Sequence, residues 1–298
     1  MIIKKTVSLK EKNSFKIGGT AKYYSEPSKE NEIIYCLNWA KDKDLPVFIM
    51  GKGSNVLISD QGWDGLVVNL SINFCNIIWN NKCANVLSGS QLNLICNQAV
   101  KRGLTGLEEL YGIPGSVGGA VLMNAGAFNT TISDSIKSVR FYDCSVSKID
   151  EIENVDINFG YRKSIFQNSN KVILSARLEL KQDLSAQELE KVRADIIRKR
   201  NIKQPLQYPN CGSVFKRPDG NYAGALIEKC GLKGFRIGDV EISQKHANFI
   251  INRGNGTAND VREIIVKVQK TVFNEYGIVL EPEVIFVGEF EEPLFSVL

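Results

Sequence analysis

Histidine and clustered cysteine are nearly absent from this sequence of 298 residues. It contains one histidine, His246, and seven cysteines that are widely spaced and form no C-x-x-C pair. A zinc site needs several such side chains at close spacing, so we expect no metal. An odd number of scattered cysteines does not suggest a disulfide framework, and it indicates a reduced, cytoplasmic protein.

Long hydrophobic runs and a strong net charge are also absent. The longest apolar runs fall far short of the roughly 20 residues that cross a bilayer, and the N-terminus lacks the apolar centre of a signal peptide. The net charge is +4 with both signs interspersed, so we expect no nucleic-acid or membrane partner, although a local basic site for a small anion has room. The chain is 43% hydrophobic, which suffices for a globular core.

Helix and strand signals follow one another along the chain. Strands are expected at 22–25, 47–50, 66–68, 138–143, 155–160 and 172–180, with a strand pair within 278–287. Pro27-Ser28 is a helix start, and the helical spacing of the apolar residues after it predicts a helix that ends at 44. Helices are also predicted over 91–102, 185–200 and from 257 to 277. The pattern is that of an α+β protein.

The helix at 185–200 has a capping box, Ser185-x-x-Glu188, and ends in Arg198-Lys199-Arg200, whose charges we expect to complement the helix dipole. Pro205 and Pro209 then break the chain. A prior of about 150 residues per domain suggests two domains or three, and the order of the predicted elements favours three lobes. Their predicted bounds are 1–70, 71–202 and 203–298.

Two loops have unusually bare backbones. Residues 112–126 contain five glycines, and Gly51-Lys52-Gly53-Ser54-Asn55 follows an apolar strand. A backbone without Cβ atoms lets a flat or charged ligand come close. Two such loops suggest a cofactor with a phosphate end and a ring end.

The first loop matches neither common phosphate motif. The dinucleotide fingerprint requires a third glycine where Val56 stands, and the ATPase phosphate loop requires its lysine after the glycines, whereas Lys52 precedes Gly53. A nest of backbone N–H donors with Ser54 and Asn55 would still suit a diphosphate. A plain Gly-Asn turn between two strands is the alternative.

The second loop lies in the segment 106–127, GLEELYGIPGSVGGAVLMNAGA, which resembles the flavin segment of the UDP-N-acetylenolpyruvoylglucosamine reductase (MurB) family. Other motifs similar to the family's stand before and after this segment, and all occur in the family's order. They lie at 13–19, 51–57, 159–164, 210–216, 243–252 and 280–284. Only 50 residues separate Arg162 from Ser213, as in the subtype that lacks an extra tyrosine-bearing loop. Phe128-Asn129 stands where Tyr-Gly is common, and we expect no loss from this difference because asparagine tolerates a left-handed backbone.

The resemblance implies FAD in the fold of vanillyl-alcohol-oxidase (PCMH-type) flavoproteins, with a C-terminal α+β substrate-binding domain. It implies that the cofactor-binding residues are Gly51, Lys52, Gly53, Ser54, Asn55, Ile113, Pro114, Gly115, Ser116, Gly118, Gly119, Ala120, Asn124 and Gly126. In the implied reaction NADPH reduces FAD, which then reduces the enolpyruvyl ether of UDP-N-acetylglucosamine to UDP-N-acetylmuramate. This is a step of peptidoglycan synthesis for cell-wall growth and division, and we expect a cytoplasmic monomer.

The resemblance also implies three catalytic residues. The fork of Arg162 suits a carboxylate, Glu283 would assist if its site raises its pKa, and Ser213 would supply the proton. Each has an ordinary alternative: a surface ion pair for Arg162, a turn hydrogen bond for Ser213, and a charge at a strand edge for Glu283.

Substrate contacts are expected at Tyr161, Lys216, Arg217 and His246, against packing, a solvated turn or a structural histidine. Cys211 is expected to be an inert thiol. Two other functions stay open. One is an alcohol oxidase or other FAD-dependent oxidoreductase of the same fold, and the other is a nucleotide-binding protein without catalytic activity. Neither requires Ser213 and Glu283 together.

Overall fold

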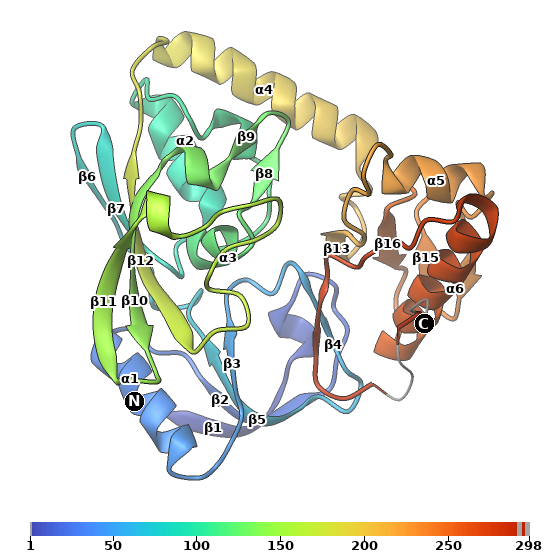
Figure 1. The fold of residues 1–298 in the computed structure, drawn as a ribbon, viewed down its shortest axis with the longest axis horizontal. Helices are drawn as coiled ribbons and strands as arrows, with labels where there is room; N and C mark the ends of the chain where they lie inside the picture. The colour runs from blue at the N-terminus through green and yellow to red at the C-terminus, as the bar shows by residue number, and fades with distance from the viewer. Residues whose placement is uncertain (1, 291–293, 296–298) are drawn as a thin grey trace. The chain divides into compact units, whose positions relative to one another are not determined.

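A computed structural model describes residues 2–290 and 294–295 (Figure 1). Its helices are α1 (Glu30–Lys41), α2 (Leu92–Lys101), α3 (Val117–Leu122), α4 (Ala186–Lys203), α5 (Ala223–Lys229) and α6 (Ala258–Tyr276). Its strands are β1 (Ile3–Ser8), β2 (Thr20–Ser25), β3 (Val47–Met50), β4 (Val56–Ile58), β5 (Trp63–Asn69), β6 (Ile77–Asn80), β7 (Cys83–Leu87), β8 (Gly126–Ala127), β9 (Thr130–Thr131), β10 (Ile136–Asp143), β11 (Lys148–Glu153), β12 (Lys171–Glu179), β13 (Asn210–Ser213), β14 (Arg236–Ile237), β15 (Val240–Ile242), β16 (Phe249–Asn252) and β17 (Ile285–Val287). Among the described helices, none combines the length and the hydrophobicity that crossing a bilayer requires.

The described residues form two compact units. The first contains residues 2–4, 24–52 and 65–200, and the second contains residues 5–23, 53–64 and those from 201 onward. The three-lobe division therefore stays a prediction. The seven cysteines all lie in the described part of the chain, and each is free there.

The first unit contains a five-stranded sheet in the order β11-β10-β12-β7-β6. The pairings described for it are antiparallel. Leu174, Ala176 and Leu178 alternate along β12 and are buried, as a strand with one core-facing side requires. Ala176 and Leu178 pack in one cluster with the apolar face of α2, which carries Ile95 and Cys96. Chain order β2-α1-β3 supplies the predicted β-α-β pattern, and β3 pairs with β5 in parallel.

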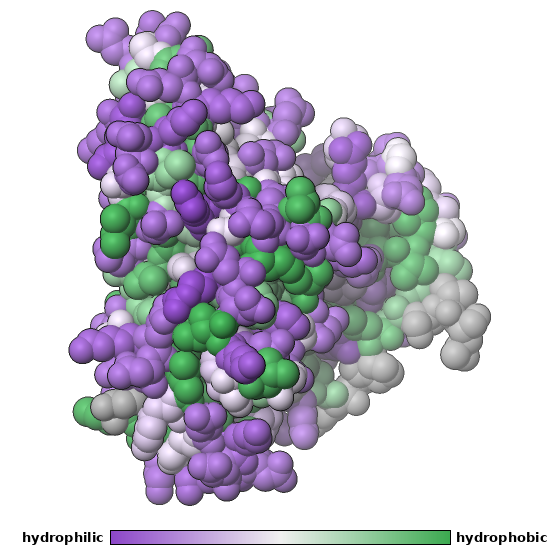
Figure 2. Space-filling view, turned by 60° about the vertical axis from the view of Figure 1, so that its left-hand side comes forward, coloured by the Kyte–Doolittle hydropathy of each residue, from purple (hydrophilic) through white to green (hydrophobic). Residues whose placement is uncertain are grey.

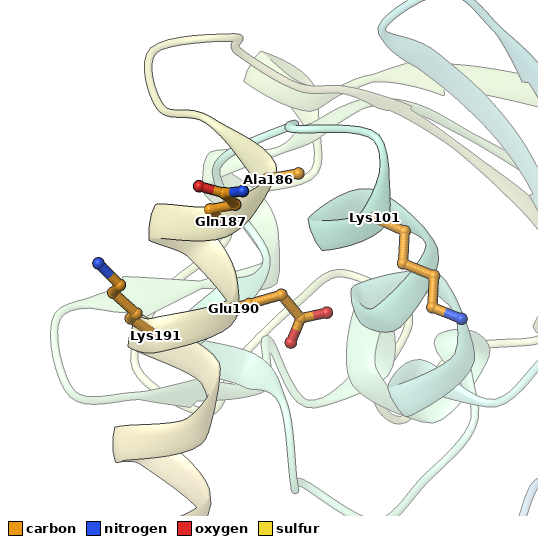
Figure 3. Close-up of a pocket in the computed structure, with 5 residues that line it drawn as sticks. All are labelled: Lys101, Ala186, Gln187, Glu190 and Lys191. Carbon is orange, nitrogen blue, oxygen red and sulfur yellow. The ribbon is translucent and has the colours of Figure 1, made fainter.

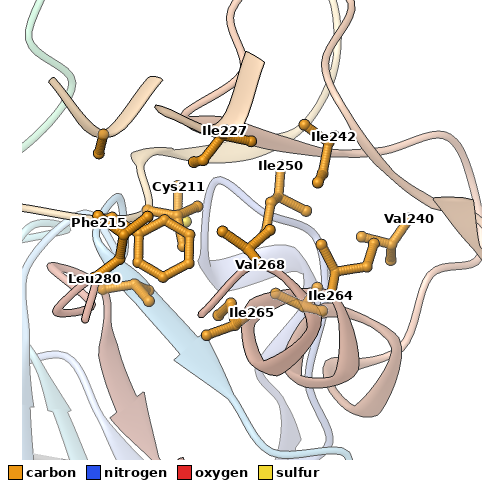
Figure 4. Close-up of a cluster of buried hydrophobic side chains, with 14 of the residues drawn as sticks. Cys211, Phe215, Ile227, Val240, Ile242, Ile250, Ile264, Ile265, Val268 and Leu280 are labelled. Atoms are coloured by element: carbon orange, nitrogen blue, oxygen red, sulfur yellow. The ribbon is translucent and has the colours of Figure 1, made fainter. Parts of the chain in front are cut away.

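The second unit is built on an antiparallel sheet in the order β13-β16-β15-β14. Helix α6 buries Ile264, Ile265 and Val268 in the same cluster as Cys211 and Phe215 (Figure 4). The helix starts with a capping box between Thr257 and Asp260, and it ends at Gly277 with φ 67°. This confirms the predicted last helix and its glycine stop, which the periodicity and the left-handed C-cap together specify.

The predicted strand at 155–160 is wrong. Residues 154–156 form a 3-10 turn, and Val155 is 85% exposed. Nδ2 of Asn154 donates to the carbonyls of Ser133 (2.7 Å) and Ile136 (2.6 Å), which holds the chain in this turn. The strand lies instead at 148–153, where alternating charged residues concealed it from hydrophobic periodicity.

The predicted strand pair within 278–287 is also wrong, since only β17 is regular there. The preceding residues bond to the chain after β13 through an isolated bridge between Phe215 and Pro282. The expected role of Arg198-Lys199-Arg200 in complementing the helix dipole also needs correction. Helix α4 continues to Lys203, so these residues are not at its end. Arg198 and Lys199 pair with Asp195, while the guanidinium of Arg200 packs where a side chain at Gly112 would stand.

The face in Figure 2 is mostly hydrophilic, with hydrophobic side chains in several groups between polar ones. This agrees with a sequence whose charges of both signs are interspersed along the chain.

Candidate active site

The two bare loops meet within the first unit. A Cβ placed on Gly51 would overlap the Oγ of Ser116, so only glycine permits this approach. Lys52 lies near the same place, with Nζ 3.5 Å from Oε1 of Gln91, and Gln91 forms a bridge with Ser116. The sequence expectation that both loops serve one ligand thus has a structural basis in the contact of Gly51 with Ser116.

The remainder of the first loop is held in the second unit by the motif at 13–19. Gly53 has φ 62°, and a Cβ there would lie 2.8 Å from Cβ of Asn13. The N–H of Ser14 donates to the Gly53 carbonyl (3.0 Å), and its Oγ donates to the Asn210 carbonyl (2.7 Å). Nδ2 of Asn55 donates to the Glu283 carbonyl (3.1 Å). The loop is therefore connected directly to the segments that carry Ser213 and Glu283.

The glycine run leaves a polar group unused beside it. Ser88 is 2% exposed, and its Oγ has no hydrogen-bond partner among the described residues. Its Cβ lies 2.8 Å from where a Cβ on Gly118 would stand, whereas a Cβ on Gly119 would meet only Ser116 Oγ, at 3.5 Å. A buried hydroxyl without a partner and open space over a glycine fit a bound polar ligand. Residues in the two loops therefore fit FAD.

Arg162 lies in a strained turn that is hydrogen-bonded to the last residues of the glycine run. Gly160 and Lys163 bond to each other's backbone (3.0 and 3.2 Å), and Arg162 between them has φ 55°. Asn124 anchors this turn by donating to the Gly160 carbonyl (3.0 Å). Nη2 of Arg162 donates to the Gly126 carbonyl (3.3 Å). A non-glycine residue in this conformation costs energy, and such strain concentrates at functional sites.

Ser213 ends β13 directly after a β-bulge. The ladder to β16 pairs Asn210 with Ile251 and Ser213 with Phe249, with an irregular register between them. Gly212 has φ 81°, and its N–H donates to Oδ1 of Asn210 (2.9 Å). A bulge redirects the side chain that follows it. The neighbouring thiol of Cys211 is buried, which raises its pKa to about 12.

Glu283 joins the serine segment through the backbone. Its N–H donates to the carbonyl of Val214 at 2.7 Å. Ser213 and Glu283 are therefore one residue apart across a backbone hydrogen bond, although 70 residues apart in sequence.

His246 is held as a neutral ring. Its Nδ1 accepts from the N–H of Asn248 (3.2 Å), and its ring packs edge-on against Phe249 with centroids 4.9 Å apart. Burial lowers its pKa below the ordinary value, and Lys233 lowers it further. With Nδ1 accepting, the ring proton is assigned to Nε2, which leaves a donor for other partners.

The other predicted substrate residues are near the surface. Tyr161 is 57% exposed, and the guanidinium of Arg162 lies 5.2 Å from its ring centroid. Lys216 forms an ion pair with Glu281, and Arg217 stacks on Tyr222 at 4.1 Å.

Several predicted cofactor residues also carry structural contacts. The Gly115 carbonyl accepts from Leu92 at the start of α2 (3.0 Å), and Ser116 caps α3. Ala120 is buried in the core, while Ile113 packs against it and Pro114 is exposed. Sequence reasoning missed Ser88 as an individual residue, although the small-residue stretch Ser88-Gly89-Ser90 after a strand was a usable signal.

A surface hollow of about 490 Å³ lies between the end of α2 and the first turns of α4 (Figure 3). Its lining is Lys101, Ala186, Gln187, Glu190 and Lys191, none of which is a predicted site residue.

The three predicted catalytic residues are divided between the two units. Arg162 belongs to the first unit, and Ser213 and Glu283 belong to the second.

Two family models match the chain. One, described as the C-terminal domain of UDP-N-acetylenolpyruvoylglucosamine reductase, matches residues 204–287. The other, described as an FAD binding domain, matches residues 21–147 and so includes both glycine loops.

Curated relatives are similar over nearly the full length. The UDP-N-acetylenolpyruvoylglucosamine reductase of Caldicellulosiruptor bescii is 43% identical over 291 residues, which cover 96% of this chain and 91% of that protein. The reductase of the same name from Clostridium novyi is 42% identical over 293 residues, covering 97% and 94%.

A solved structure has the same fold. The UDP-N-acetylenolpyruvylglucosamine reductase of Thermus caldophilus superposes with a TM-score of 0.81 at 32% identity, covering 96% of this chain and 100% of that one. Together with the FAD binding domain match, this confirms the predicted α+β fold: an FAD-binding fold of the vanillyl-alcohol-oxidase type with a C-terminal domain.

Proposed function

Because the chain belongs to the UDP-N-acetylenolpyruvoylglucosamine reductase family and is an FAD-dependent oxidoreductase, we propose that it reduces the enolpyruvyl ether of UDP-N-acetylglucosamine to UDP-N-acetylmuramate with electrons from NADPH. FAD, held by the residues of the two glycine loops, would supply the hydride chemistry that links NADPH to the methylene carbon of the enol ether. The protein's own residues then have to bind the carboxylate, stabilise its growing charge and supply a proton.

Arg162 is the residue we assign to the substrate carboxylate. Its guanidinium presents a planar fork of donors on a turn that is anchored by Asn124. A cation fixed in advance stabilises developing negative charge without having to reorganise. Glu283, once protonated, would donate a second hydrogen bond to that charge.

Ser213 is the residue we assign to proton transfer, and its placement is the observation that carries the proposal. It follows a bulge that reorients its side chain, and the next peptide is bonded to Glu283. Its hydroxyl is a weak acid, but the carbon next to the carboxylate becomes a strong base once hydride has been added, so the transfer is favourable.

The three-lobe division 1–70, 71–202 and 203–298 is part of the proposal, with the last lobe binding substrate. We also propose contacts to the UDP-sugar from Tyr161, Lys216, Arg217 and His246. The protein would work as a cytoplasmic monomer, where NADPH and nucleotide sugars are available.

Ser213→Ala should separate the two half-reactions. Flavin reduction by NADPH should proceed near the wild-type rate, because that step needs no proton from Ser213. Flavin reoxidation by the enolpyruvyl substrate should slow by about 10²–10⁴-fold, the usual contribution of a positioned proton donor. Stopped-flow absorbance of the flavin follows each step separately.

Slowing of the NADPH step alone, or equal slowing of both steps, would exclude Ser213 as the proton donor. Substrate affinity is the control: it should change little, because removing a small hydroxyl mainly affects the transition state.

A further inference from the structure

The side chain of Asn248 bonds to both polar groups of one residue in the serine segment. Nδ2 donates to the carbonyl of Phe215 (2.8 Å), and Oδ1 accepts from the N–H of Phe215 (3.0 Å). Asn248 is 8% exposed and Phe215 is 2% exposed, so water does not compete readily for these groups. A buried amide whose donor and acceptor are both used holds its partner in one position.

This side chain replaces a pair of backbone bonds that the sheet cannot form. Beyond Ser213 and Phe249 the ladder stops, because the chain before β16 turns so that the N–H of Phe249 donates to the His246 carbonyl (2.9 Å). The backbone of Asn248 makes one more bond, accepting from the N–H of Val214 (2.9 Å). Its side chain then extends the pairing to Phe215.

The segment 213–215, which Asn248 holds through hydrogen bonds to Val214 and Phe215, carries the proposed chemistry. Ser213 stands between the left-handed Gly212 and the clamp on Val214 and Phe215. The Val214 carbonyl in turn accepts from the N–H of Glu283. Asn248 therefore fixes the backbone of Val214, which follows Ser213 in the chain and is hydrogen-bonded to Glu283.

We propose that Asn248 is a positioning residue for the reaction: it holds Ser213, and through Val214 also Glu283, in the orientation that proton transfer requires. This inference rests on the proposed function. Since Asn248 acts through the backbone of other residues, its loss should affect the step that uses Ser213 and leave the step that does not.

Asn248→Leu in the FAD-loaded enzyme tests this, because leucine keeps the volume and removes both hydrogen bonds. Flavin reduction by NADPH should stay within about twofold, while reoxidation by the enolpyruvyl substrate should slow by about 10-fold to 10²-fold, since a misplacement of about 1 Å can cost that much. Amide hydrogen exchange at Phe215, which does not depend on activity, should become faster. Asn248→Ser is the second variant, which decides the question if Asn248→Leu does not fold.

Asn252, the last residue of β16, which begins directly after Asn248, offers a matched control. It is also buried, at 1% exposure, and its side chain bonds to the carbonyls of Phe15 (3.2 Å) and Lys16 (3.4 Å) and to the N–H groups of Gly254 (2.9 Å) and Gly256 (3.0 Å). Asn252→Leu should lower the unfolding temperature but leave reoxidation within about threefold, because its side-chain partners lie outside the serine segment.

Normal reoxidation in a folded Asn248 variant would overturn the inference, as would equal slowing of both half-reactions. Comparable slowing in Asn252→Leu would overturn it too, because the effect would then be general destabilisation. If the wild-type flavin is not reoxidised by the substrate at all, the proposed function itself fails, and the inference fails with it.

Discussion

Single residues near the glycine run adopt backbone conformations that their side chains disfavour. Arg162 and Phe128 both have φ 55°, in the left-handed region. Phe128, and not the asparagine after it, takes this conformation. The N–H of Asn129 donates to Oε2 of Glu109 (3.0 Å).

Arg162→Gly separates the backbone cost from the function of the guanidinium. Glycine relieves a strain of about 1–3 kcal/mol but costs about 0.5–1 kcal/mol of chain entropy, so the unfolding free energy should change little. Turnover should fall by about 10²-fold or more, as for loss of an electrostatic donor. Denaturant unfolding and steady-state kinetics measure the two effects, and retained turnover would remove Arg162 from the mechanism.

His246 should make stability depend on pH. Burial holds its folded pKa below its ordinary value of 6.5, with Lys233 and Lys203 acting in the same direction and Glu228 opposing. The unfolded chain therefore takes up a proton first, so stability is full above pH 6.5 and is lost as pH falls towards the folded pKa.

The measurement is the unfolding free energy between pH 7.5 and pH 5.5 for wild type and His246→Gln, which cannot titrate. Wild type should lose more over this interval. Parallel curves would show that His246 gains its proton equally in both states.

At the level of elements, α3 shows why two adjacent glycines are not equivalent. In its first turn, Gly118 packs against Ser88, whereas Gly119 faces open space and is exposed. A side chain at Gly118 must therefore displace the fold, but one at Gly119 need not.

Gly119→Val should consequently fold with a stability close to wild type, apart from helix propensity of less than about 1 kcal/mol, and should lose FAD. Gly118→Val should lose both FAD and stability, with overpacking costing about 1–3 kcal/mol. Flavin content after purification and thermal unfolding distinguish the two. A Gly119→Val protein that retains full FAD would show that the cofactor does not lie over this turn.

At the scale of the whole molecule, each of the two units has its own hydrophobic core. The flavin segment 106–127 contains no histidine or cysteine for a covalent link. FAD should therefore be bound non-covalently and should stabilise the folded chain by mass action.

Removal of FAD should lower the unfolding temperature, and FAD at about 100 times its Kd should restore about 2.7 kcal/mol. FMN, which lacks the adenylyl half and its phosphate, should stabilise less if the loop at 51–55 binds a diphosphate. Identical unfolding of FAD-free and FAD-loaded protein would argue against the assigned loops.

Local sequence patterns predicted the positions of several helices and the family of this protein. Periodicity and capping located α2, α4 and α6, because helices depend on side chains three or four residues apart. The order of the motifs, among them 106–127 and 210–216, correctly indicated the reductase family, because the chemistry requires those residue types at those spacings.

Tertiary structure decided the rest, because it depends on partners distant in sequence. The strand at 148–153 exists through its pairing with β10, and 154–156 became a turn through the bonds of Asn154 to residues 133 and 136. Likewise the bulge at Gly212, the link of Ser14 to Gly53 and Asn210, and the clamp of Asn248 on Phe215 arise where separate segments meet. Hydrogen bonds of this kind leave no periodic trace in the sequence, since each joins residues whose separation is set only by the completed fold.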